Sequence, residues 1–448
     1  MSTDSAWWCE YAWLPSGQVA SRVLVTVVDG LISAVEAGVD RPSGAVLLRG
    51  LVIPGLANTH SHAFHRALRG RTQAGRGDFW TWRQQMYGVA NRLDPSTYLA
   101  LARATYAEMA LAGITCVGEF HYVHHQPDGV PYDDPNVMGA ALVLAAEQVG
   151  VRLTLLDTCY VAGGFGEPLS APQLRFGDGD ADGWAKRASA LEGALEGGPH
   201  VRIGAAIHSV RAVPADQLGV VADWVRDRDV PLHFHLSEQQ AENDGCLALY
   251  GVTPTQLLAS SGAMGPVATA VHATQLRGGD ISLIAGTATG VCFCPTTERD
   301  LADGIGPAGA LLAAGVPLSL GTDGQSVIDL FEEARALELD ERLASQVRGT
   351  FSAAQLLDAA TVAGHRALGW SDAGQIAVGM RADLVAVDLE SRRTAGAGAS
   401  ADAIVFAAAA SDVTDVIVDG VAIVRDRRHL RIDDVGVALR EAIEAVTP

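Results

Sequence analysis

Lysine is almost absent from the sequence. Lys186 is the only one, so arginine makes up the other 31 of the 32 basic residues. Schiff-base catalysis and a Walker-type phosphate-binding loop each need a lysine at a defined place in the active site. Lys186 lies in a polar stretch, residues 183–187, that is typical of neither. The sequence therefore argues against both kinds of chemistry.

Positive charge is also in deficit. The 32 Lys+Arg residues face 52 Asp+Glu residues, which gives a formal net charge of −20 at pH 7. Nucleic-acid binding needs clustered positive charge to contact phosphates, so this balance argues against that function. An anionic substrate would need arginines placed locally, because the protein as a whole repels it.

The sequence also lacks a disulfide framework and a membrane-targeting segment. Its six cysteines are scattered, which is typical of reduced core residues in a cytosolic protein. No apolar run approaches 18 residues, and the N-terminus shows no basic segment followed by an apolar one. We therefore expect a cytoplasmic protein that does not interact with membranes.

Apolar residues are plentiful enough for a large core. They make up 48% of the 448 residues, whereas charged residues make up 19%, as is typical of globular proteins. The length is consistent with about three domains or with one α/β barrel and an appended domain.

The two ends of the sequence share a β-rich pattern. Near the N-terminus two apolar, β-branched runs flank Asp29-Gly30, and near the C-terminus two such runs flank Asp419-Gly420. An Asp-Gly dipeptide between such runs predicts a β-hairpin. Because both ends are β-rich and flank a long middle, we expect one small β-sandwich domain built from residues 1–53 and 373–448.

The middle of the sequence, residues 54–372, alternates short apolar runs with Ala/Leu-rich stretches. Eight β-then-α units can be counted when the run at residues 51–53 is taken as the first. The other runs lie at residues 114–119, 152–156, 201–207, 231–235, 268–272, 290–294 and 317–320. Helices are expected at residues 98–112, 136–148, 215–227 and 330–344. This repetition predicts an α/β fold whose catalytic domain is a (β/α)8 TIM-like barrel.

Residues that bind metals recur at the ends of these runs, where a barrel has its active site. His60 and His62 follow the first run, His235 ends a later one, and Asp323 follows the last. In extended backbone residues i and i+2 point to the same side, so His60 and His62 can bind one ion. Imidazole is a good zinc ligand. Core packing explains a single His-x-His pair, but it does not explain further candidate ligands at other strand ends.

Glu238 and Asp323 have expected roles that follow from their positions. Glu238 lies three residues after His235, where it can exchange protons with the attacking water or the leaving group without binding the metal. The alternative is a carboxylate that stabilises a helix N-terminus. Asp323 can bind the metal and the attacking water, and its alternative role is to cap the following helix.

These residues resemble the amidohydrolase superfamily, in particular its cytosine-deaminase-like branch. The resemblance covers almost the whole chain and rests on Pro54-Gly55, His60-x-His62, His235-x-x-Glu238, His272, Asp323 and the segment Gly374-x-Ile376-x-x-Gly379-x-x-Ala382-Asp383-Leu384-Val385. It implies one zinc ion per chain, with iron as an alternative, bound by His60, His62, His235 and Asp323, with His272 beside it. Members with two metals bridge them through a carboxylated lysine, and no strand end here has a lysine.

Longer blocks resemble those members of the family that deiminate a linear formimino group. The blocks are His60-Ser61-His62-Ala63-Phe64, Phe79-Trp80-Thr81-Trp82-Arg83, Glu119-Phe120-His121-Tyr122-Val123-His124-His125, His208-Ser209-Val210-Arg211-Ala212-Val213 and His235-Leu236-Ser237-Glu238-Gln239. The resemblance implies hydrolysis of N-formimino-L-glutamate to N-formyl-L-glutamate and ammonia in histidine degradation, by a homodimer. His65 departs from the pattern, which has a glutamine there near the substrate.

The implied substrate carries two carboxylates and a formimino cation. Arginine binds a carboxylate through two parallel hydrogen bonds, so Arg83 and Arg211 are the expected carboxylate ligands. The other expected substrate-binding residues are His65, Tyr122 and His208. Arg83 could instead act in a neighbouring subunit or stack on a tryptophan at the surface, and His208 could be a core histidine.

Glu238, His272 and Asp323 are the expected catalytic residues. Two other functions remain open. A related zinc aminohydrolase could deaminate a heterocycle such as guanine or a pterin, but Arg83 and Arg211 would then have no purpose. A catalytically inactive metal-binding scaffold is the second alternative, and the presence of both Glu238 and Asp323 argues against it.

Overall fold

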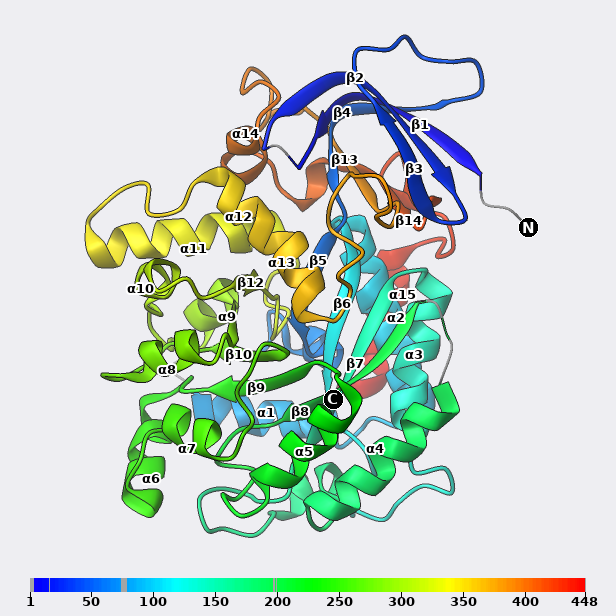
Figure 1. Cartoon of the computed structure of the whole chain (residues 1–448). Helices are drawn as coiled ribbons and strands as arrows, with labels where there is room; N and C mark the ends of the chain where they lie inside the picture. The colour runs from blue at the N-terminus through cyan, green and yellow to red at the C-terminus, as the bar shows by residue number, and fades with distance from the viewer. Residues whose placement is uncertain (1–3, 16, 74–78, 196–197, 199, 448) are drawn as a thin grey trace.

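Two eight-stranded sheets organise the chain (Figure 1). The structure is a computed structural model that describes residues 4–15, 17–73, 79–195, 198 and 200–447. In the view of Figure 1 one sheet forms a barrel in the lower part of the molecule. The other sheet, made from the first and the last strands of the chain, lies above it.

The barrel is a parallel sheet whose strands follow one another in chain order. Its two edges meet at a backbone bridge between Ser61, at the end of the first strand, and Asp323, just after the last. The predicted (β/α)8 barrel is thereby confirmed. Its strands are β5 (Leu56–Ser61), β6 (Ile114–His121), β7 (Arg152–Cys159), β8 (Val201–Ile207), β9 (Leu232–Leu236), β10 (Ala268–His272), β11 (Gly290–Phe293) and β12 (Leu318–Leu320).

The first barrel strand is not the predicted one. Residues 51–53 belong to β4 (Val46–Pro54) and pair with the other sheet, so their assignment to the barrel was wrong. The barrel begins instead at Leu56. Strand β5 is fully buried but contains Asn58 and Thr59, so it does not form the apolar run that the prediction relied on. The other seven predicted runs coincide with β6 to β12.

Helices cover the outside of the barrel (Figure 1). The α-helices are α1 (Phe79–Ala90), α2 (Pro95–Leu111), α3 (Val137–Val149), α4 (Ala181–Leu195), α5 (Leu218–Arg228), α6 (Gln240–Tyr250), α7 (Pro254–Ser260), α8 (Asp280–Gly286), α9 (Pro295–Asp300), α10 (Ala308–Ala313), α11 (Leu330–Ser345), α12 (Ala353–Ala360), α13 (Val362–Ala367), α14 (Ala401–Phe406) and α15 (Val435–Val446). The 3₁₀ helices are η1 (Ala63–Leu68), η2 (Ala171–Phe176) and η3 (Ala410–Asp412). The four predicted helices correspond to α2, α3, α5 and α11.

Short polar side chains cap the N-termini of several of these helices. Asp94 accepts hydrogen bonds from the amides of Ser96 and Thr97, and Pro95 occupies the first helical position of α2. Thr253 caps α7 in the same way, with a proline next in the chain. Such caps satisfy amide groups that have no partner inside the helix, and proline loses nothing there because that amide is free anyway.

The second sheet joins the two ends of the chain, as predicted. Its strand order is β16-β15-β14-β13-β4-β1-β2-β3, and β4 pairs antiparallel with β13. The strands besides β4 are β1 (Ser5–Trp13), β2 (Val19–Val28), β3 (Leu31–Glu36), β13 (Leu384–Val387), β14 (Val413–Val418), β15 (Val421–Arg425) and β16 (Arg428–His429). Asp29-Gly30 and Asp419-Gly420 form the two predicted hairpin turns, and all four residues have positive φ, as a type I′ turn requires.

The two faces of strand β4 contribute side chains to different hydrophobic cores. Val52 packs in a small core of its own sheet, whereas Leu51 and Ile53 belong to the large core that includes the barrel. Successive residues of a strand point to opposite faces, so this one strand connects both hydrophobic cores. Helix α15 returns to the barrel and packs on α2.

Ion pairs of Arg152 link the barrel to the second sheet. The fully buried side chain of Arg152 forms ion pairs with Asp383 and, at 2.8 Å, with Asp419. Arg381 lies 3.2 Å from Asp419, and the guanidinium groups of Arg152 and Arg381 both lie over the ring of Trp370. A buried charge without a partner is costly, so these pairs hold the two sheets in one arrangement.

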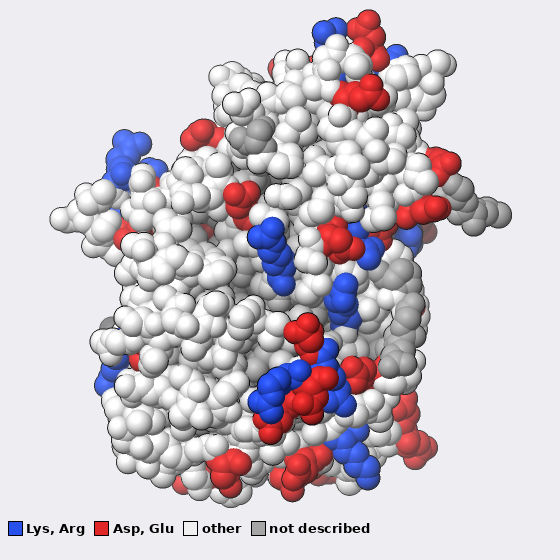
Figure 2. All heavy atoms as spheres, viewed as in Figure 1, with Lys and Arg blue, Asp and Glu red and all other residues white. Residues whose placement is uncertain are grey.

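The surface carries mixed charge on the face drawn in Figure 2, where blue and red side chains lie close together in small clusters. Among the described helices, none is long and apolar enough to cross a membrane.

Replacing Arg152 by Met should lower the free energy of unfolding by about 3–5 kcal/mol, because it leaves buried carboxylates without their partner. Urea denaturation followed by circular dichroism measures the change. Arg22→Met is the control, since Arg22 pairs with Asp40 through side chains that are 53% and 96% exposed. This control should change the free energy by less than about 1 kcal/mol. Equal losses in the two variants would contradict the assigned role of Arg152.

Candidate active site

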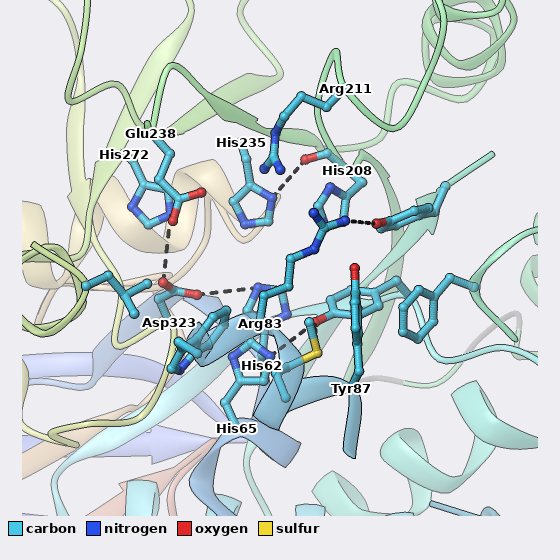
Figure 3. Close-up of a pocket in the computed structure, with 16 residues that line it drawn as sticks. His62, His65, Arg83, Tyr87, His208, Arg211, His235, Glu238, His272 and Asp323 are labelled. Carbon is cyan, nitrogen blue, oxygen red and sulfur yellow. Dashed lines mark hydrogen bonds and ion pairs between the residues drawn. The ribbon is translucent and has the colours of Figure 1, made fainter. Parts of the chain in front are cut away.

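The residues singled out in the sequence converge on one cavity at the carboxyl ends of the barrel strands (Figure 3). The cavity is lined by His62, His65, Trp82, Arg83, Met86, Tyr87, Tyr122, Tyr160, Phe176, His208, Arg211, His235, Glu238, His272, Leu301 and Asp323. His60 lies directly behind this wall and is fully buried.

Four buried residues present metal-binding atoms to one point. One atom from each of His60, His235, His272 and Asp323 lies within 4.8 Å of the others. Nε2 of His60 is 3.2 Å from Nε2 of His235 and 3.2 Å from Oδ1 of Asp323. Three imidazoles and a carboxylate form the donor set that zinc prefers. The resemblance placed His272 beside the metal, and the structure groups it with three of the implied ligands.

His62, the fourth implied ligand, reaches the same carboxylate from the cavity side. Its Nε2 lies 3.4 Å from Oδ1 of Asp323. It also forms a second group of possible metal-binding residues with His65 and Asp323. Asp323 is therefore the residue that connects all the candidate ligands.

Backbone carbonyls orient two of the histidines. Nδ1 of His62 lies 3.0 Å from the carbonyl oxygen of Phe120, and Nδ1 of His235 lies 2.8 Å from that of His208. A carbonyl only accepts hydrogen bonds, so each Nδ1 must carry the proton and each Nε2 presents its lone pair to the site. This is the usual way in which a protein fixes the tautomer of a metal-binding histidine.

Burial and charge prepare these groups for a cation. Burial lowers the pKa of His60, His62 and His235, so all three are neutral and able to bind a metal. Burial alone would raise the pKa of Asp323, but the neighbouring imidazoles, His60 foremost, outweigh it and hold that pKa below its usual value. The donor set thus carries one negative charge and fits a divalent metal ion.

Backbone hydrogen bonds at the edge where the barrel closes hold the ligands in register. The amide of Asp323 donates to the carbonyl of His60 at 3.0 Å, and the amide of His62 donates to the carbonyl of Asp323 at 3.2 Å. Beneath them, Asn58 accepts from the amide of Thr322 at 2.9 Å and donates to its hydroxyl at 2.7 Å. The polar residues of β5 that obscured this strand in the sequence therefore hold the edges of the barrel together.

Glu238 and His272 lie next to the metal-binding group. Nε2 of His272 is 3.8 Å from Oε1 of Glu238 and 3.7 Å from Oδ2 of Asp323. Burial raises the pKa of Glu238, and the negative charges of nearby carboxylates add to this effect. Burial opposes a charge on His272, but Glu238 and the other carboxylates around it raise its pKa well above the usual value. Both groups can therefore hold a proton at the reaction centre.

The two arginines line the opposite part of the cavity (Figure 3). Nε of Arg211 lies 3.8 Å from Oε2 of the buried Glu242. Arg83, on α1, donates a hydrogen bond to the hydroxyl of Tyr160 at 3.2 Å and lies over the ring of Tyr87. Arg83 thus lines the cavity of its own chain.

The remaining predicted substrate-binding residues form one aromatic wall. Nε2 of His65 lies 3.1 Å from the hydroxyl of Tyr122, and burial lowers the pKa of His65 to about 3, so this histidine is neutral. Its Nδ1 is buried and has no hydrogen-bond partner among the residues that the structure describes. His208 packs against Tyr122 and Tyr160, with ring centroids 5.5 Å and 4.3 Å away.

Several residues of the site were not predicted from the sequence. Tyr160 directly follows β7 and Glu298 lies just after β11, so the strand-end rule that found the histidines could have found both. Tyr87, Met86 and Trp82 come from α1, which lies outside the strand ends and gives no such signal.

A third group of possible metal ligands, His121, His124 and Asp157, lies outside the cavity. The carboxylate of Asp157 already accepts hydrogen bonds from Arg187 at 2.8 Å and 2.9 Å and from Trp184 at 2.8 Å. A guanidinium therefore balances its charge, and this group is a buried polar network rather than a second metal centre.

Comparisons with known proteins identify the family of the chain. The model of the Amidohydrolase family matches residues 51–423. Formimidoylglutamate deiminase of Pseudomonas aeruginosa is 37% identical over 438 residues, which cover 95% of this chain and 96% of the relative. An amidohydrolase from Brucella melitensis superposes with a TM-score of 0.91 at 32% identity over 99% of both chains. An adenosine deaminase from Xanthomonas campestris, solved with bound zinc, has a TM-score of 0.87 at 27% identity over 99% of this chain and 97% of its own. The chain belongs to the amidohydrolase family and is a hydrolase.

Proposed function

We propose that the protein hydrolyses N-formimino-L-glutamate to N-formyl-L-glutamate and ammonia in the degradation of histidine. The observation that carries the proposal is the division of charge within the cavity. Arg83 and Arg211 line one part, whereas Glu238 and Asp323 line the part next to the metal-binding group. A substrate with two carboxylates at one end and a formimino cation at the other matches this division. The similarity to the Pseudomonas deiminase supports the same substrate.

The proposed cofactor is one zinc ion per chain, with iron as the alternative. His60, His62, His235 and Asp323 would hold it, since their donor atoms are buried, mostly neutral and oriented by the backbone. When bound there, zinc supplies a Lewis acid that activates water near neutral pH.

Glu238 moves the proton in the proposed reaction. Its carboxylate accepts a proton from the water that attacks the formimino carbon, and Asp323 accepts a hydrogen bond from the same water. The attack gives a tetrahedral carbon that bears the new oxygen and the amino group. His272, 3.8 Å from Glu238, donates a hydrogen bond to the new oxygen. Glu238 then delivers its proton to the departing nitrogen, the C–N bond breaks, and ammonia leaves. The new oxygen gives its remaining proton to Asp323 and becomes the carbonyl oxygen of N-formyl-L-glutamate.

The substrate carboxylates are bound at the other end of the cavity. Arg211 and Arg83 offer the paired N–H groups that bind carboxylates best. Tyr122, His208 and His65 complete the binding site in this proposal. The neutral His65 acts there as a hydrogen-bonding group in place of an amide, through the Nδ1 atom, which has no partner in the described part of the chain. The homodimer and the cytoplasmic location remain predictions.

The first test is ammonia release. Zinc-loaded protein should release ammonia from N-formimino-L-glutamate, and Asp323→Asn should abolish the release because it removes a metal ligand that also binds the attacking water. A coupled glutamate dehydrogenase assay measures the product. Bound zinc without ammonia from any amidine or heterocyclic amine would favour the inactive scaffold.

Glu238→Gln should lower kcat by about 10²- to 10⁴-fold, the usual contribution of a general acid–base group. Zinc content should stay at one ion per chain, because Glu238 is not expected to bind the metal. Steady-state kinetics and metal analysis of the same preparation check both parts. Near-full turnover by this variant would assign the proton transfer to another residue.

Arg211→Ala separates the dicarboxylate from a heterocyclic substrate. Loss of a charged hydrogen bond should raise KM for N-formimino-L-glutamate by about 10- to 100-fold. Guanine and a pterin, tested as alternative substrates, have no carboxylates that need this arginine. An unchanged KM for N-formimino-L-glutamate would contradict the assignment of Arg211 and would favour the heterocycle deaminase.

A further inference from the structure

His272 forms a buried ion pair with Glu298, a residue to which the proposed mechanism gives no role. Oε1 of Glu298 lies 3.3 Å from Nδ1 of His272. Both residues are almost completely buried, with exposed fractions of 5% and 1%. On the other side of the imidazole, Nε2 faces Glu238 and Asp323. The ring thus lies between Glu298 and the reacting groups.

His272 has an unusual backbone conformation that depends on the contacts around it. His272 has a φ of 70° and Ala273 a φ of 51°, so two residues without a glycine's freedom lie in the left-handed region. Such a conformation persists only where surrounding contacts determine it. The ring stacks on that of His235 at 5.5 Å, but stacking does not decide which ring nitrogen faces the metal. Only a polar partner distinguishes Nδ1 from Nε2.

Glu298 itself is held firmly. The amide of Cys294 donates a hydrogen bond to its Oε1 at 2.9 Å, and Glu298 belongs to the short helix α9. The preceding residue, Thr297, accepts a hydrogen bond from the amide of Gly324 at 3.1 Å. Residues 294–298 therefore contact both His272 and the segment that contains Asp323.

We propose that Glu298 is a positioning residue that fixes His272 with its Nδ1–H toward Glu298 and its Nε2 toward the substrate. This inference rests on the proposed function for the identity of the reaction. Without Glu298 the imidazole could rotate, and its Nε2 would no longer point at the oxygen formed on the substrate. Substrate binding at the arginines would be unaffected.

The kinetic test compares Glu298→Ala with Glu298→Gln. The alanine variant should lower kcat about 100-fold, in line with other residues that orient a functional histidine, while KM changes less than about threefold. The glutamine variant keeps an oxygen that can accept the Nδ1–H, so it should recover at least about tenfold of the lost kcat. Zinc content should remain one per chain in both. A glutamine variant as slow as the alanine variant, or loss of zinc, would overturn the proposal.

Glu333→Gln is the matched control. Glu333 is also buried and also holds α9, through the amide of Thr296 at 2.9 Å, but it does not contact His272. Burial raises the pKa of Glu333 well above its usual value, so glutamine is a close substitute. This control should keep kcat within about threefold of the parent. A loss equal to that of Glu298→Ala would mean that α9 matters only as a structural support.

A second measurement does not depend on turnover. In protein labelled with ¹⁵N-histidine, the parent should show a solvent-protected Nδ1–H resonance that disappears in His272→Asn and is thereby assigned. The resonance should persist in Glu333→Gln and be lost in Glu298→Ala. Its survival in Glu298→Ala would overturn the proposal, even if N-formimino-L-glutamate proved not to be the substrate.

Discussion

Closure of the barrel between β5 and the segment after β12 is the interaction on which the site depends. The amide of Asp323 binds the carbonyl of His60, and the amide of His62 binds the carbonyl of Asp323. Asp323 therefore lies between the two histidines in a parallel ladder and cannot move without breaking backbone hydrogen bonds. The same bonds that complete the fold bring the donors to within a few ångströms of one another.

The charge of the cavity differs from the charge of the protein. A chain with a formal charge of −20 repels a dicarboxylate at long range, yet the cavity offers two arginines that are each held in place. Arg211 is held by Glu242 and Arg83 by the hydroxyl of Tyr160. At the other end, Glu238 and Asp323 remain available to a cation. The division of charge thus favours one orientation for a zwitterionic molecule bound in the cavity.

The convergence of the candidate ligands could be predicted from the sequence because these residues lie at strand ends. The sequence pattern predicts His60, His62, His235 and Asp323 as ligands, and in the structure their side chains converge. Their roles as ligands stay predictions. The strand β5 itself was missed, because the residues that hold the edges of the barrel together are polar and interrupt the apolar pattern.

Other parts could not be read from the sequence. The contact between Glu298 and His272 joins residues 26 positions apart, and it depends on how two loops turn after their strands. The hydrogen bond between Arg83 and Tyr160 joins residues 77 positions apart. Patterns of periodicity report which side of an element is buried, but they do not report which polar groups meet across a cavity.

The pairing of β4 with β13 has a consequence for synthesis of the chain. Pro54 pairs with Leu384, so the ribosome must add 330 residues before this partner exists. During that time β4 has one neighbour, β1, and its other edge exposes free backbone amides and carbonyls along an apolar strand. Unpaired edges of this kind recruit strands from other molecules. This edge of β4 therefore stays open to such pairing until the C-terminal strands emerge.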